Sequence, residues 1–160
     1  MQNIKILLFV ASCLLFFNAC DKGPAVEIPF QAFVTIPAGL NTGLSYHFEV
    51  GDLPGISDKL IDAQPANVTL SVVYGESNLD FVHQAYFYTW KDSVIREMAY
   101  QTDMPFAGYA TVQLYPSILN MSDHITQDRF DMELKLIFRG IPATETRIRI
   151  DFSVQATLEG

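Results

Sequence analysis

Apolar and polar residues alternate with a period of two along most of the chain after residue 25. Strict alternation is typical of a β-strand that buries one face and exposes the other. Glycine, proline and asparagine interrupt the pattern at 37–43 and 75–78, where turns are expected, and 51–65 is interpreted as a longer loop. The alternating segments cover approximately 26–36, 44–50, 68–74, 79–90, 94–100, 111–115, 130–138 and 148–156.

Seven or eight strands with little helix predict an all-β fold. We expect an antiparallel β-sandwich of immunoglobulin-like or jelly-roll type, with a closed barrel as the alternative. The segments 79–90 and 94–100 are separated by only three residues, which indicates a hairpin. One segment differs: within 116–128, Ile118, Met121 and Ile125 stand near helical spacing. A short helical crossover is expected there.

The first 20 residues follow another pattern. Lys5 precedes the run 6–17, which is apolar at every position except Ser12. Twelve residues form a helix of about 18 Å, too short for a hydrocarbon core of about 30 Å. This arrangement is typical of a secretory signal peptide. The expected organisation is a signal peptide over 1–19, a tether over 20–25 that begins with Cys20, and one β-domain over 26–160.

The junction Phe17-Asn18-Ala19-Cys20 resembles the lipobox of bacterial lipoproteins. The resemblance implies transfer of diacylglycerol to the Cys20 thiol, cleavage before Cys20, and acylation of the new amino terminus. The whole chain is similar to small lipoproteins of Bacteroidota that carry one β-sandwich behind a lipidated cysteine. The lipobox-like junction implies a lipid-anchored location in the bacterial envelope. Asp21 directly after Cys20 resembles a retention signal, and no dense acidic cluster for surface export follows, so the periplasmic side is expected. The whole-chain resemblance implies no activity.

Composition narrows the function classes. The chain is 49% hydrophobic and 18% charged, which excludes a disordered protein. Its net charge of −8 disfavours nucleic acid as a partner. The second cysteine, Cys13, lies inside the signal run, so the mature domain is expected to contain no disulfide and no cysteine nucleophile.

Known catalytic motifs, cofactor fingerprints and metal-ligand spacings are not found in the sequence. His47, His83 and His124 are far apart. His124 follows Asp123 in the expected crossover, and of the three histidines it is the candidate for a general base or a metal ligand. We therefore expect a non-catalytic binding or assembly module without cofactor or metal, whose ligand is a glycan or an envelope protein. A purely structural envelope protein and a hydrolase with an unrecognised site are the alternatives.

One strand carries the candidate site. In 79–90, Tyr86, Tyr88 and Trp90 point away from the face that carries Phe81 and Phe87. If Trp90 stands opposite residue 94 in the hairpin, Tyr88 faces Arg96. The three rings and Arg96 would then form an exposed platform for a ligand. The alternative is that the stripe is buried, because a strand that is apolar on both faces is often covered on both sides.

Overall fold

The computed structural model describes residues 23–51, 59–125 and 129–159, and they form an antiparallel β-structure without α-helix. This confirms the all-β expectation. The strands are β1 (Ala25–Ile36), β2 (Gly43–Gly51), β3 (Leu60–Tyr74), β4 (Val82–Lys91), β5 (Val94–Gln101), β6 (Thr111–Pro116), β7 (Arg129–Phe138) and β8 (Thr146–Leu158). In the described residues, no helix is long and apolar enough to cross a membrane.

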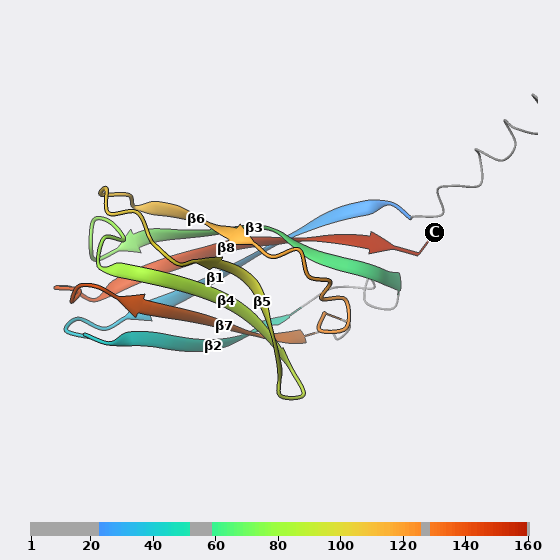
Figure 1. Ribbon diagram of the computed structural model, residues 1–160, viewed down its shortest axis with the longest axis horizontal. Helices are drawn as coiled ribbons and strands as arrows, with labels where there is room; N and C mark the ends of the chain where they lie inside the picture. Colours follow the sequence, from blue (N-terminus) through green and yellow to red (C-terminus); the bar gives the residue numbers. More distant parts are fainter. Residues whose placement is uncertain (1–22, 52–58, 126–128, 160) are drawn as a thin grey trace, which may run out of the picture.

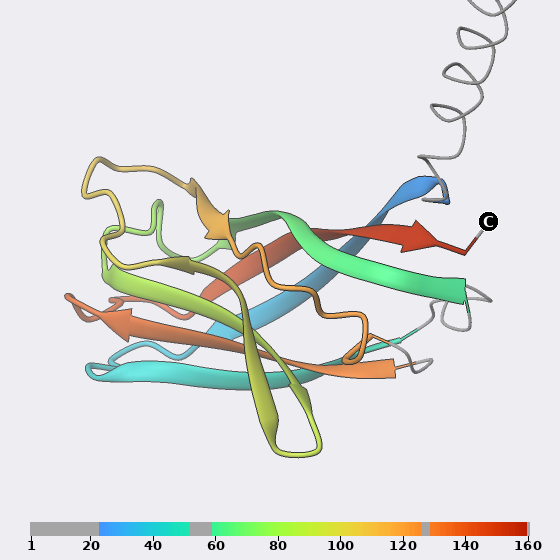
Figure 2. The same cartoon turned by 45° about the vertical axis from the view of Figure 1, so that its right-hand side comes forward.

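The eight strands form one sheet in the order β1-β8-β3-β6-β5-β4-β7-β2, and every pair is antiparallel. The sheet curls until its two edge strands approach each other, which gives a nearly closed barrel (Figures 1 and 2). Side chains bridge the interior: Phe30 of β1 contacts Phe130 of β7 with ring centroids 5.5 Å apart, and Phe87 of β4 contacts Phe152 of β8 at 5.0 Å.

The alternating pattern produces the core. On β4, for example, Ala85, Phe87 and Thr89 point inward and are fully buried. On β8, Ile148 and Ile150 do the same. Burial of these apolar faces is the main force that stabilises the sheet.

Two sequence-based expectations differ from the structure. The prediction of a loop over 51–65 is wrong for its last residues, because β3 begins at Leu60. Register shifts lie between Leu60 and Asp62 and between Pro65 and Asn67, and each shift breaks the alternation that would have revealed the strand. In the expected crossover, 117–125 forms a hydrogen-bonded turn at Met121 and no helix, while 126–128 lie outside the described residues.

The loops gather at the two ends of the barrel. Four connections, 37–42, 75–81, 102–110 and 139–145, lie at the end opposite the C-terminus (Figure 1). They are tied together by hydrogen bonds. The amide of Gly39 donates to the carbonyl of Pro142 at 2.9 Å, and Arg139 donates to the carbonyls of Val82 and Met104. Hydrogen bonds therefore connect the loops at this end of the molecule to one another.

The opposite end holds the start of β1 and the end of β8, while the hairpin of β4 and β5 projects from the side of the barrel (Figures 1 and 2). Ala25 pairs with Thr157, so the first and last strands end side by side. Residues 1–22, with Cys20 and the expected signal peptide, lie outside the described residues.

Candidate binding face

Tyr86, Tyr88 and Trp90 lie on the outer face of β4. They alternate with the buried Ala85, Phe87 and Thr89, so the stripe does not face the core. Each of the three rings is nevertheless partly buried. The neighbours that cover them determine what the stripe can bind.

The hairpin has a different register from the expected one. Asp92 and Ser93 form a two-residue turn with φ of 48° and 69°, the conformation that matches the twist of a β-hairpin. Lys91 therefore pairs with Val94, and Trp90 with Ile95. A bulge between Phe87 and Tyr88 shifts the register again further along the pair.

Because of this register, Arg96 does not lie on the outer face with Tyr86, Tyr88 and Trp90. It pairs with the inward-facing Thr89, and Glu97 takes the place opposite Tyr88. The Arg96 guanidinium donates to the Asn120 carbonyl at 2.5 Å and to the Asp123 carboxylate at 2.7 Å, both in the crossover. The expectation that Arg96 stands among the three rings is wrong, because the turn and the bulge displace it to the other face.

Two tyrosines that sequence reasoning did not include extend the stripe across neighbouring strands. Tyr100 of β5 pairs with Tyr86, and Tyr115 of β6 pairs with Tyr100, with the last two ring centroids 6.1 Å apart. Tyr100 is 37% exposed and Tyr115 is 59% exposed. We call Tyr86, Tyr88, Trp90, Tyr100 and Tyr115 the aromatic face. Only the strand order could have revealed it, since the five residues come from three segments of the chain.

Trp90 is held by a buried carboxylate. Its indole N–H donates to Glu133 Oε2 at 2.8 Å, and the hydroxyl of Ser45 donates to the other oxygen of Glu133. The ring of His47 contacts the indole edge to face at 5.5 Å, and its Nε2 lies 3.8 Å from Glu133. Glu133 is only 8% exposed, so these contacts satisfy a carboxylate that would otherwise be costly to bury. They also fix the orientation of the indole.

Tyr86 and Tyr88 stack on each other with an interplanar angle of 8° and centroids 6.1 Å apart. Burial raises the pKa of the Tyr88 phenol above its usual value of 10.0, and Glu97 raises it further by charge repulsion. Burial also raises the pKa of the Glu97 carboxyl. Tyr88 therefore remains a neutral hydrogen-bond donor beside a partly desolvated carboxyl group.

His124 occupies a different place, beneath the hairpin. It is 4% exposed, and its Nδ1 has no hydrogen-bond partner among the residues that the structure describes. Burial lowers its pKa, so the ring is neutral near pH 7. Lys91, Arg96 and Asp123 line a groove of about 250 Å³ beside it. Among the described residues, no group of three histidine, cysteine, aspartate or glutamate side chains could hold a metal ion.

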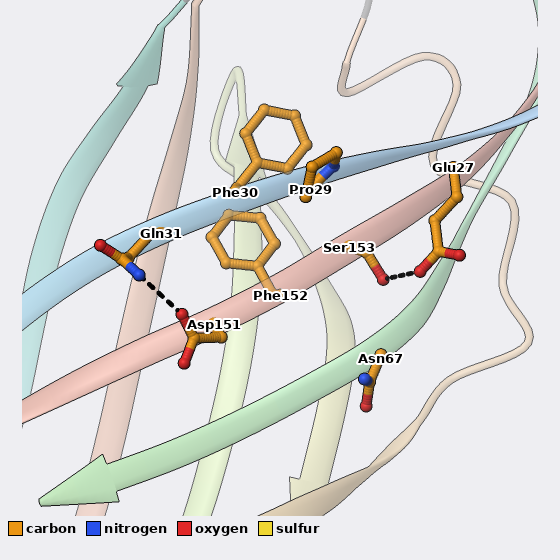
Figure 3. A pocket seen from close by; sticks show the side chains of 8 residues that line it. All are labelled: Glu27, Pro29, Phe30, Gln31, Asn67, Asp151, Phe152 and Ser153. Atoms are coloured by element: carbon orange, nitrogen blue, oxygen red, sulfur yellow. Dashed lines mark hydrogen bonds between the residues drawn. The ribbon is translucent and has the colours of Figure 1, made fainter.

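A second groove, of about 380 Å³, crosses β1, β8 and β3 (Figure 3). Its polar side chains already bind one another: Gln31 donates to Asp151 at 2.9 Å, and Ser153 donates to Glu27 at 2.6 Å. Phe30 and Phe152 stack beneath them at 5.0 Å. A ligand here would have to displace internal hydrogen bonds, which makes this groove a weaker candidate than the aromatic face.

The aromatic face is thus the surface on which the described structure best combines large rings with polar groups. Comparison with known proteins adds no assignment: no protein-family model matches the chain, and no curated protein matches it closely enough to count as a relative.

Proposed function

We propose that this protein is a non-catalytic binding module, anchored in the bacterial envelope, that holds a partner protein on its aromatic face. The observation that carries the proposal is the collection of five aromatic rings from three adjacent strands on one outer surface. Tyrosine and tryptophan are enriched in protein interfaces, where each offers a large apolar area and one polar group.

The arrangement of the rings favours a protein over a glycan. A sugar stacks on a broad, open aromatic surface, but Tyr86 and Tyr88 are paired with each other, nearly parallel with ring centroids 6.1 Å apart. Trp90 has His47 against it. The face thus offers ring edges and hydroxyl groups, with Glu97 and Lys135 beside them. Mixed edges of this kind are suited to the polar and apolar side chains of a protein surface.

The anchor proposed for the module is the lipid on Cys20, after removal of residues 1–19. The composition of 6–17 and the lipobox-like junction support it. The first strand begins at Ala25, so a tether of five residues would hold the domain against the membrane. Buried acyl chains contribute about 0.8 kcal/mol for each methylene, which makes an anchor of two or three chains stable.

We also propose that the nearly closed sheet is a sandwich of two halves, β1-β8-β3-β6 and β5-β4-β7-β2. The support is the short contact between β5 and β6, where only Ala99 with Pro116 and Tyr100 with Tyr115 are paired. The immunoglobulin-like or jelly-roll type of this sandwich stays a prediction.

Site-specific photo-crosslinking in intact cells tests the binding function. A photoreactive amino acid at position 115 should give one adduct of defined mass, and Tyr100→Ala should weaken it. Position 74 is the matched control, since Tyr74 is 69% exposed on β3 and outside the aromatic face. Equal adducts from positions 115 and 74, or no adduct from position 115, would contradict the proposal.

The same strains distinguish the alternatives. If purified envelope glycans quench or shift the fluorescence of Trp90, the only tryptophan, and no protein adduct forms, the ligand is a glycan. Hydrolysis of an envelope substrate that is lost in His124→Gln would favour the hydrolase. Envelope defects in a deletion strain that are rescued equally by wild type and by Tyr100→Ala would favour a structural role.

A further inference from the structure

The barrel is open along one line. Of the strands that the structure describes, β1 and β2 each have a hydrogen-bonded neighbour on one side only, β8 and β7 respectively. The two free edges converge at the turn 37–42 and diverge toward the other end of the barrel (Figure 2). We call this line the seam.

Burial along β1 follows the seam, whereas the inward positions of β2 are partly buried or exposed throughout. Near the turn, the inward-facing Val34 and Ile36 of β1 are 1% and 0% exposed. Further from the turn, the inward-facing Phe30 and Ala32 are only partly buried, and so is Phe48 of β2. Inward-facing residues on the neighbouring interior strands are buried, such as Phe152 of β8 and Phe130 of β7. The core is therefore exposed to water where the edges diverge.

The opening is a groove of about 360 Å³. It is lined by residues 28–32 of β1 and 48–51 of β2. Beneath it, Phe30 contacts Phe130 at 5.5 Å and Phe48 contacts Phe87 at 6.1 Å. The groove thus has aromatic rings at its base, and the unpaired backbone edges of β1 and β2 lie on its two sides.

We propose that the seam accepts an extended segment of another polypeptide, which adds to the free edge of β2 as a further strand. A strand is the ligand whose backbone satisfies a row of unpaired amide and carbonyl groups, and whose alternate side chains enter the groove. β2 is the better template of the two edges. Its sequence contains no proline, whereas Pro29 interrupts the donors of β1.

The chemistry of the occupant follows from the groove. Its inward residues are apolar and occupy every second position, in order to pack on Phe30 and Phe48. Its outward residues are neutral or basic, since the chain carries a net charge of −8. Glu49 on the same edge adds to this preference only in part, because its carboxylate also pairs with Arg129 at 3.5 Å. To cover the nine residues of β2 it must extend over about 30 Å, at about 3.4 Å for each residue. The seam contains no residue of the aromatic face, so this proposal is independent of the function proposed above.

The test begins with a phage library of random twelve-residue peptides, selected on the wild-type domain, residues 21–160. Enriched peptides should alternate between apolar and polar residues. Ala32→Trp, which fills the groove, should reduce the affinity of the best peptide by at least about tenfold. Thr35→Trp is the matched control, because Thr35 lies on the outer face of the same strand, and it should leave the affinity unchanged.

A second measurement uses the wild-type domain alone. The best peptide should slow amide hydrogen exchange in Gly43–Gly51, and the same peptide methylated at alternate backbone nitrogens should fail to bind, because it cannot pair as a strand. Absence of enriched alternating peptides, or equal binding of the methylated peptide, would overturn the proposal. A concentration-dependent dimer of the free domain that Ala32→Trp abolishes would overturn it too, since the occupant would then be a second copy.

Discussion

Replacement of Trp90 by Phe removes one hydrogen bond and keeps an aromatic ring at the surface. The lost bond joins the indole N–H to Glu133 Oε2 over 2.8 Å. Hydrogen bonds to charged groups contribute about 1.5–3 kcal/mol. Because Trp90 is partly exposed, water replaces some of this contribution, and we expect a loss of about 1–2 kcal/mol. For a domain of this size, that lowers the melting temperature by about 3–8 °C.

Urea unfolding followed by far-UV circular dichroism measures this loss without using the tryptophan itself. Tyr86→Phe is the matched control, because it removes a hydroxyl that donates to the side chain of Gln84 at 3.2 Å, and should change stability by no more than about 0.5 kcal/mol. A double-mutant cycle with Glu133→Ala should show a coupling of about 1 kcal/mol. If Trp90→Phe is no more destabilising than Tyr86→Phe, or if the coupling is zero, the carboxylate does not hold the indole.

Three further predictions concern the turn at Gly75, the buried His124 and the proposed lipid anchor at Cys20. Gly75→Ala should destabilise the domain by at least about 2 kcal/mol, since φ is +97° and a Cβ would lie 2.1 Å from the Glu145 carbonyl oxygen; Gly39→Ala, with open space and φ of +79°, should lose only about 1 kcal/mol in the same unfolding curves. Burial lowers the pKa of His124 below its usual 6.5, so the unfolded chain binds more protons and the stability that the neutral ring contributes is lost as the pH falls below about 6.5. His124→Gln should remove this part of the pH dependence, and parallel urea midpoints for both proteins from about pH 7 to pH 5 would disprove it. Cys20→Ser should move the protein out of the membrane fraction or leave residues 1–19 uncleaved, as seen by fractionation and mass spectrometry, and a cleaved protein that stays with the membrane would show that another anchor exists.

Most of the strands could be predicted because burial on one face imposes a period of two on the sequence. The prediction was wrong where the period is broken. The first half of β3 contains two register shifts, and each one moves the following side chains to the opposite face. A strand of this kind has no simple pattern, so the sequence predicts a loop over 60–65 although these residues pair with β8.

The candidate face was only partly predictable for a related reason. The outward direction of Tyr86, Tyr88 and Trp90 follows from alternation alone. The partner of each depends on the turn at Asp92 and on a one-residue bulge, neither of which the hydrophobic pattern records. Alternation alone therefore predicts the wrong face for Arg96.

The order of the strands in the sheet is harder still to predict from the sequence. Glu133 and Tyr115 belong to the same surface as Trp90 because β7 and β5 flank β4, and β6 follows β5. Non-local pairing of this kind is decided by how the whole set of apolar faces packs together, and no local signal in the chain specifies it.

The side-by-side ends of β1 and β8 determine how the domain bears mechanical load. Twelve residue pairs join these antiparallel strands, beginning with Ala25 and Thr157, and their hydrogen bonds run across the strand direction. If the chain is held on the N-terminal side of β1 and pulled from the opposite end of the barrel, β1 is loaded along its length and all the pairs resist together. When the pull comes through the C-terminal residue, the same pairs open one after another from Thr157. The same pair of strands thus resists a load along β1 strongly and a load on the end of β8 weakly.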